Sequence, residues 1–194
     1  MIQSLELFDR FLLLSINGFH LPWLDQVMWQ LSESWHTYLF VFVFAFYFYK
    51  KFDLKKAVEL LVGIAIVIAC CDLSANVVKH AVKRYRPSHN TEIQDKIITV
   101  NNYRGGTYGF FSSHAANSFG ITAFVYFCLF GKPKKYRLLL FLYPALIVYS
   151  RMYLGVHYPS DILVGMMAGL FFGRLIFGLM NRHFFKFNEK NTPA

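Results

Sequence analysis

Charged residues are scarce in this 194-residue sequence, in which Asp, Glu, Lys and Arg together make up 16%. An average soluble domain contains about 25% of them. Hydrophobic residues reach 56%, and Phe alone occurs 22 times. A soluble domain of this size leaves roughly 30% of its unfolded surface in water, so it could not bury so many apolar side chains. The scarcity of charge excludes a soluble domain, a disordered chain and a coiled coil, and it indicates an integral membrane protein.

Cysteine and acidic residues are also few. The three cysteines, Cys70, Cys71 and Cys128, lie inside apolar runs, which excludes a disulfide framework and a cysteine metal cluster. The sequence has no run of carboxylates to hold Mg²⁺, so we expect neither a metal nor a cofactor. The 20 Lys and Arg exceed the 11 Asp and Glu, giving a net charge of +9. Because no basic, aromatic-interleaved module is present, we assign these cations to membrane topology and an anionic ligand, with no nucleic-acid partner.

Five apolar stretches are long enough to cross about 30 Å of hydrocarbon as helices. They cover residues 29–49, 57–78, 113–130, 138–153 and 162–179. Before them, apolar residues recur at helical spacing from Leu5 to Ile16, with Glu6, Asp9 and Arg10 between them. A crossing helix would bury these three ionisable side chains, so we expect a helix that lies in the membrane interface. The sequence therefore predicts an all-α membrane bundle of six helices, forming one domain over residues 1–194.

Basic side chains cluster in the segments 50–56, 132–137 and 182–190. If the spans alternate in direction, these segments lie on the same side, which the positive-inside rule makes cytoplasmic. The connections 79–112 and 153–161 then face outward together. The basic residues concerned are Lys50, Lys51, Lys55, Lys56, Lys132, Lys134, Lys135, Arg137, Arg182, His183, Lys186 and Lys190.

The two outward connections contain an unusual set of polar residues at the ends of apolar helices. The first contains Lys79, Arg86-Pro87 and Ser112-Ser113-His114, and the second contains Ser150-Arg151, His157 and Asp161. Polar groups are energetically costly at such positions, which makes them functional candidates.

The spacing of these residues suggests their chemistry. His157 and Asp161 are four residues apart, so an early start of the last helix would place them on one face. The carboxylate would then accept one ring N–H and leave the other nitrogen free to attack. Ser112 or Ser113 is suited to cap a helix whose N-terminus faces an anion. His114 could protonate a leaving oxygen.

The remaining cations complete a site for phosphate. Lys79, Arg86 and Arg151 could surround the same anion, and guanidinium groups offer paired donors to phosphate oxygens. The residues therefore predict a phosphate site that carries two histidines.

The pattern Lys79-x6-Arg86-Pro87, Ser112-Ser113-His114 and Ser150-Arg151-x5-His157-x3-Asp161 resembles the three-part motif of the type 2 phosphatidic acid phosphatases. That PAP2 superfamily also includes soluble acid phosphatases and vanadium haloperoxidases. The first and third parts match fully. The second departs from the usual Pro-Ser-Gly-His, because Phe111 and Ser113 replace its proline and glycine.

The resemblance implies a PAP2/haloperoxidase-like helical core and a metal-independent phosphohydrolase. His157 would attack phosphorus to form a phosphohistidine, Asp161 would orient it, and His114 would protonate the leaving group. The phosphoryl oxygens would be bound by Lys79, Arg86, Ser112, Arg151 and the amide of Ser113.

The substrate expected from this resemblance is an amphiphile whose tail stays in the bilayer. The leading candidate is undecaprenyl diphosphate, dephosphorylated at the outer face of a bacterial cytoplasmic membrane. The alternative is the phosphate of lipid A or of a glycerophospholipid, either phosphatidylglycerol phosphate or phosphatidate, because the motifs bind phosphate and not the tail. An alternative from a different functional class is a non-catalytic lipid-phosphate binder or transporter. A vanadate enzyme is disfavoured because those relatives are soluble.

Other polar residues receive more ordinary assignments. We expect Arg84 at the surface, although recruitment of an anionic head group is the alternative. Asp72 and Asn76 lie four residues apart below Lys79, where they could support the site or form interhelical hydrogen bonds. The histidines outside the motifs are expected to be structural. They are His20, His36, His80, His89 and His183.

Overall fold

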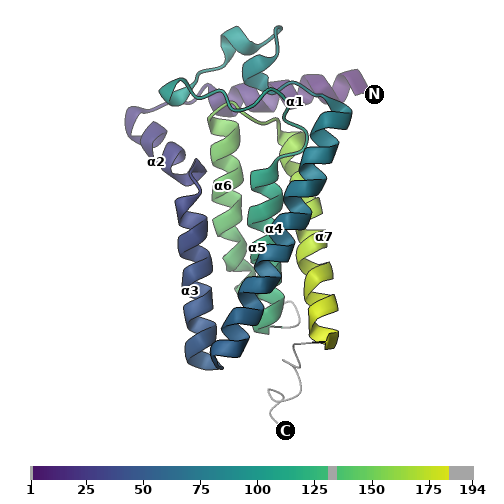
Figure 1. The fold of residues 1–194 in the computed structure, drawn as a ribbon. Coiled ribbons are helices and arrows are strands. Elements are labelled where there is room, and N and C mark those ends of the chain that lie inside the picture. Colours follow the sequence, from purple (N-terminus) through teal and green to yellow (C-terminus); the bar gives the residue numbers. More distant parts are fainter. Residues whose placement is uncertain (1, 131–134, 184–194) are drawn as a thin grey trace.

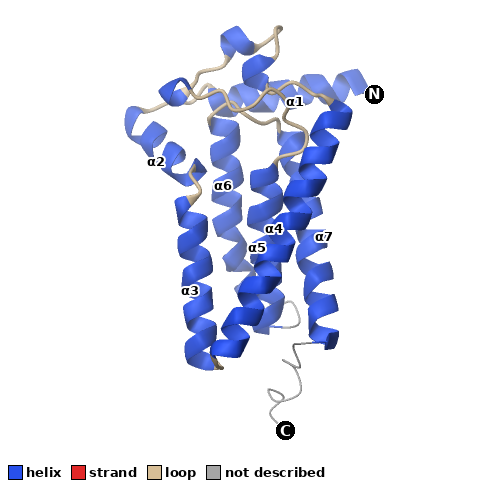
Figure 2. Cartoon of the chain, in the orientation of Figure 1, coloured by secondary structure: helices blue, strands red, loops and turns tan. Residues whose placement is uncertain are grey.

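The structure is a computed structural model that describes residues 2–130 and 135–183. Within this part there are seven α-helices and no β-strand (Figure 2). Helices α3 to α7 stand side by side as a bundle, while α1 lies across one end of it (Figure 1). The helices are α1 (Ile2–Asn17), α2 (Pro22–Ser32), α3 (Trp35–Lys51), α4 (Leu54–Val82), α5 (Ser113–Phe130), α6 (Leu142–Tyr153) and α7 (Pro159–His183).

The predicted all-α membrane bundle is confirmed, but the described residues contain one helix more than the six expected. The stretch 29–49 is not continuous, because Glu33 adopts an extended backbone with φ −73° and ψ 157°. This break separates α2 from α3. Helix α2 begins at Pro22, a residue favoured at the first helical position, and Trp29 on it packs edge-on against Tyr103 at 5.4 Å. Packing on the long connection after α4 therefore explains why α2 turns away from α3.

Helices α4 and α7 are, among the described residues, those with both the length and the apolar composition needed to cross a membrane. Both extend beyond the predicted stretches. The side chain of Asp53 caps α4 by accepting a hydrogen bond from the backbone N–H of Lys56 at 2.7 Å. Helix α6 has only 12 residues, because residues 135–141 form a 3₁₀ helix instead of its expected first part.

The contact between α5 and α7 depends on three glycines of α7 at four-residue intervals. A Cβ atom on Gly165, Gly169 or Gly173 would lie 2.5, 2.2 or 2.4 Å from the carbonyl oxygen of Ser112, Ala116 or Gly120, respectively. Small residues at this spacing allow two membrane helices to approach closely. The contact holds the start of α5 against the first turn of α7, where the Ser112 N–H donates to the Asp161 carbonyl at 3.0 Å.

The connections between α4 and α5 and between α6 and α7 lie at the end of the bundle covered by α1, opposite the α3–α4 turn (Figure 1). This agrees with the alternating arrangement predicted from the basic clusters. Four of the predicted basic anchors, Lys132, Lys134, Lys186 and Lys190, lie outside the described residues. Asn17 fixes the end of α1, because its Nδ2 donates to the carbonyls of Tyr153 at 2.8 Å and Ile98 at 2.9 Å.

Candidate active site

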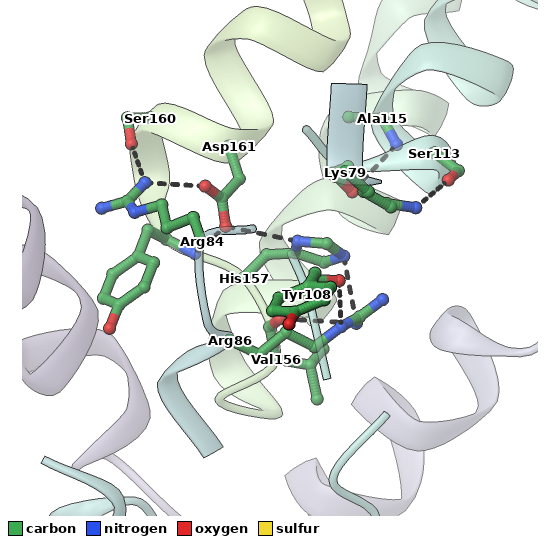
Figure 3. A network of polar contacts seen from close by, with 12 residues as sticks. Lys79, Arg84, Arg86, Tyr108, Ser113, Ala115, Val156, His157, Ser160 and Asp161 are labelled. Carbon is green, nitrogen blue, oxygen red and sulfur yellow. Dashed lines mark hydrogen bonds and ion pairs between the residues drawn. The ribbon is translucent and has the colours of Figure 1, made fainter. Parts of the chain in front are cut away.

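A short antiparallel pairing places Arg86 in the site. The Arg86 N–H donates to the Thr107 carbonyl at 3.0 Å, and the Gly109 N–H donates to the Arg84 carbonyl at 2.9 Å. The guanidinium of Arg86 donates from Nε to the Tyr108 carbonyl at 3.2 Å. These bonds hold Arg86 between the α4–α5 connection and the turn before α7 (Figure 3).

His157 is fully buried in this turn, two residues before α7 begins. The expected shared helix face with Asp161 is therefore wrong, but the turn still brings the two side chains together, with Nδ1 3.5 Å from Asp161 Oδ2. On the other side of the ring, Nε2 lies 3.3 Å from Arg86 Nη1 (Figure 3). A guanidinium only donates, so Nε2 must be the unprotonated nitrogen and the ring proton belongs on Nδ1, toward Asp161.

The surroundings of His157 keep its imidazole neutral. Burial lowers the pKa of His157 well below the ordinary value for histidine, and the charges of Arg86, Arg151 and Lys79 lower this pKa further. A neutral imidazole with an unprotonated Nε2 is the form that can attack phosphorus.

Asp161 is held by a network of two buried carboxylates and the half-buried Arg84, which the sequence did not predict. Its Oδ1 accepts from Arg84 Nη1 at 2.7 Å, and its Oδ2 accepts from the Tyr158 N–H at 3.0 Å. Arg84 Nη2 donates to Asp9 Oδ2 at 2.6 Å, and Asp9 Oδ1 accepts from the Ser160 N–H at 2.8 Å. The network connects α1 to the first turn of α7.

The expected surface position of Arg84 is therefore wrong. Neither Arg84 nor Asp9 belongs to the three motifs. One sequence signal could have identified Arg84: it lies two residues before Arg86, so an extended segment directs both side chains to the same side.

The start of α5 provides the second part of the site. Ser112 is fully buried, and its Oγ accepts from the Ala115 N–H at 3.4 Å, as expected of an N-cap residue. Ser113 begins the helix and is not among the residues with positive φ. Its hydroxyl accepts from Lys79 Nζ at 2.5 Å, which a glycine at this position could not do (Figure 3).

His114 lies in the same electrostatic environment as His157. The positive charges of Arg151, Arg86 and Lys79 lie close enough to interact electrostatically with the ring of His114. The ring of His157 does so as well. His114 also lines a cavity of about 290 Å³. The predicted site residues thus come together from α4, α5, α6 and the two connections.

Arg151 is buried, and each of its two terminal nitrogens donates one hydrogen bond within the protein. Nη1 donates to Ser32 Oγ, and Nη2 donates to the Tyr103 hydroxyl at 3.0 Å. Its Nε has no hydrogen-bond partner among the residues that the structure describes. Helix α2 and the α4–α5 connection therefore orient this guanidinium.

Four histidines outside the motifs bond to residues close to them in the sequence, which agrees with the structural assignment. The ring nitrogens of His20, His36, His80 and His89 lie 2.7, 2.6, 2.8 and 3.2 Å from oxygens of Asp25, Leu31, Asn76 and Ser88, respectively. Of the expected roles of Asp72, an interhelical bond is present, because its Oδ1 accepts from Asn117 Nδ2 at 2.8 Å.

Comparison with known proteins identifies the family. A family model described as the PAP2 superfamily matches residues 56–185, more than half of the chain. The chain belongs to the PAP2 superfamily. This confirms the resemblance seen in the three motifs, and the protein is a membrane lipid phosphatase of the PAP2 type.

Two curated relatives carry the name Lipid A 4'-phosphatase. The protein from Porphyromonas gingivalis is 33% identical over 170 residues, covering 87% of this chain and 71% of its own length. The protein from Bacteroides thetaiotaomicron is 37% identical over 187 residues, covering 94% of this chain and 81% of its own length. These names do not support undecaprenyl diphosphate as the leading substrate, whereas they agree with the alternative expected above.

Two crystal structures share the PAP2 fold with this chain. The PAP2-type phosphatidylglycerolphosphate phosphatase from Bacillus subtilis is 20% identical, with a TM-score of 0.69 over 93% of this chain and 88% of that chain. Aquifex aeolicus LpxE is 24% identical, with a TM-score of 0.61 over 86% of this chain and 93% of that chain. At these identities the two structures support the fold and not the substrate.

Proposed function

We propose that this PAP2 phosphatase removes the 4'-phosphate of lipid A. The observation that carries the choice of substrate is the identity of 33% and 37% to two bacterial proteins of that name, over most of both chains. The reaction is supported by the convergence of two histidines, three cations and the N-terminus of α5.

In the proposed mechanism, Nε2 of His157 attacks phosphorus and forms a P–N bond. The P–O bond breaks and its electron pair remains on the sugar oxygen. His114, which takes up a proton when the negatively charged phosphate binds beside it, protonates that oxygen. Asp161 stabilises the proton on Nδ1 of His157. Water then attacks phosphorus and gives one proton to His114, while the P–N bond breaks and its electron pair returns to Nε2. Inorganic phosphate leaves, and His157 is again a neutral imidazole.

Fixed cations would stabilise the transferring phosphoryl group, since phosphoryl transfer depends chiefly on positioning and charge. We assign this role to Lys79, Arg86 and Arg151, together with Ser112 and the amide of Ser113. The scheme needs no metal, so activity should survive excess EDTA.

We further propose that the site faces away from the cytoplasm of a bacterial inner membrane. Lys50, Lys51, Lys55 and Lys56 gather at the α3–α4 turn, at the end of the bundle opposite α1 and the site (Figure 1). The positive-inside rule places such a basic turn in the cytoplasm.

A phosphate-release panel on the purified full-length protein tests this function. The substrates are lipid A with both phosphates, undecaprenyl diphosphate, phosphatidylglycerol phosphate and phosphatidate, and His157→Asn serves as the inactive control. We expect the highest kcat/KM with lipid A and, by mass spectrometry, a product that has lost only the 4'-phosphate. A higher kcat/KM with another substrate, or loss of the 1-phosphate, would refute the proposal.

A further inference from the structure

The cavity beside His114 lies between α3, α4 and α5 and is distinct from the Asp161 network. His114 and Ser113 line it next to the phosphate site, and Glu33, Asp72 and Asn117 line it farther away. Its volume of about 290 Å³ is close to the lower end of the range of about 300–1,000 Å³ typical of ligand pockets. A site of this size accommodates part of a lipid head group.

The side chains of this cavity include polar groups that the protein itself does not satisfy. Asn117 Nδ2 donates to Asp72, but Asn117 Oδ1 is buried without a hydrogen-bond partner among the described residues. Neither Asp72 nor Glu33 forms a salt bridge with any side chain in the described ranges. Asp72 stands on the long apolar helix α4, two turns before Lys79. A carboxylate on a membrane-spanning helix, bonded there to Asn117 and not to a cation, indicates a function.

The position of His114 determines which part of the substrate this cavity would hold. In the mechanism proposed above, His114 protonates the leaving oxygen, so the leaving group must lie beside His114. The cavity begins at this residue. It therefore lies on the side of the alcohol and not on the side of His157, which attacks from the opposite direction.

We propose that this cavity binds the sugar of a phosphomonoester and that Asp72 and Glu33 disfavour diphosphates. The inference rests on the proposed function and refines its substrate class. A sugar head group provides hydroxyl and amide donors for two carboxylates and for Asn117 Oδ1. A diphosphate would place a second phosphate beside the same carboxylates, and like charges at close range suppress the wrong ligand.

The apolar residues of the cavity agree with this ligand. Ile121 and Ile147 are buried and line the same space as the carboxylates. A sugar ring presents C–H groups as well as hydroxyls, so a mixed surface of this kind suits it better than it suits a phosphate. The cavity thus selects its ligand by charge and by hydrogen bonding.

The test compares Asp72→Asn and Glu33→Gln with wild-type protein on two soluble substrates, phenyl phosphate and farnesyl diphosphate. We expect Asp72→Asn to raise the ratio of kcat/KM for the diphosphate to that for the monoester about tenfold, because one like charge is removed. Glu33→Gln should raise it less, since Glu33 lies in the break between α2 and α3, whereas Asp72 stands on α4 and is held by Asn117. The matched control is Asp53→Asn, which changes a carboxylate at the opposite end of α4 to another good capping residue.

The same variants are then assayed with lipid A, for which Asp72→Asn and Asn117→Ala should raise KM. A diphosphate-to-monoester ratio within twofold of wild type in both charge variants would overturn the proposal. If Asp72→Asn does not fold, the diphosphate-to-monoester ratio of Glu33→Gln and the KM of Asn117→Ala for lipid A decide whether the proposal stands. Failure of the proposed function has a different result: wild type would not prefer lipid A, yet the charge variants would still change the ratio on the soluble substrates.

Discussion

The two flanks of His157 differ in how far the protein satisfies its own polar groups. On the α1 side, both oxygens of Asp161 accept hydrogen bonds, and Arg84 is held between Asp161 and Asp9. On the α3 side, a cavity begins at His114, and the Oδ1 of Asn117 has no partner within the described ranges. Both carboxylates of the first flank find their partners within the protein, although His157 Nδ1 has no hydrogen-bond partner among the described residues, whereas the second flank has an amide oxygen left for substrate. Substitutions on the α1 side should therefore slow all substrates equally, and those on the α3 side should change the preference between substrates.

The largest effect should come from His157 itself, which lies between the two flanks. We expect His157→Asn to reduce kcat by about 10⁴-fold or more for every substrate, because no other group would form the phosphoenzyme. Phosphate release and acid-quenched trapping of labelled phosphoenzyme measure this loss. Residual turnover above one per cent, in a variant that purifies as wild type does, would place the nucleophile elsewhere.

The network on the α1 side of His157 can be disrupted by a substitution of Asp9. We expect Asp9→Asn to lower kcat by about 10- to 100-fold with little change in KM, because Arg84 would orient Asp161 less firmly. The reduction should be equal for phenyl phosphate and lipid A.

A matched control for Asp9→Asn is the carboxylate that pairs with the next residue of α1. Arg10 pairs with Glu92 at the exposed surface, so Glu92→Gln should leave kcat within twofold of wild type. If Asp9→Asn acts only on stability, its kcat per folded molecule will be normal and the positioning role will be wrong.

A smaller effect is expected where the α4–α5 connection passes over the site. A Cβ atom on Gly109 would lie 3.1 Å from both Asp161 Oδ2 and Arg86 Cγ, whereas one on Gly106 would meet nothing within 4 Å. We expect Gly109→Ala to lower kcat/KM about tenfold and Gly106→Ala to leave it within twofold. Equal values for the two variants would show that this connection does not position Arg86 and Asp161.

Ser113 lies between the two flanks, and substitutions there test whether its hydroxyl affects phosphate binding. Its hydroxyl accepts from Lys79, so it competes with the substrate phosphate for this ammonium group. We expect both Ser113→Gly and Ser113→Ala to lower KM about two- to threefold, in line with the loss of one hydrogen bond. A change in Ser113→Gly alone would instead assign the effect to the backbone, and a higher KM in both would contradict the competition.

The last prediction is that a change of pH leaves His157 unaltered where an ordinary histidine would titrate. Because burial and three cations lower the pKa of His157, its ring should remain neutral at pH 5.5, where a free histidine is about nine-tenths protonated. Side-chain ¹⁵N NMR of labelled protein measures this, with the resonance assigned by its absence in His157→Asn. A titration midpoint near 6.5 would show that the cations do not act on the ring.

The sequence was sufficient to predict the parts of the site that local spacing determines. Ser112 caps α5, His157 faces Asp161, and α1 crosses the end of the bundle, as expected. The sequence did not predict the Arg84 network, since Arg84 and Asp161 lie 77 residues apart and Asp9 and Arg84 lie 75 residues apart. Such contacts depend on how α1 and α7 pack, which no periodicity in one segment encodes. For the same reason, the break between α2 and α3 was missed.

Helix α1 lies across the bundle, yet Asp9 on it is linked through Arg84 to Asp161. The amphipathic sequence of α1 predicts that such a helix contacts the surrounding amphiphiles as well as protein. Detergents or lipids that lift α1 would consequently slow turnover while leaving the five upright helices in place. Reconstitution conditions for this enzyme are therefore best judged by its rate of phosphate release, because far-ultraviolet dichroism would scarcely register the loss.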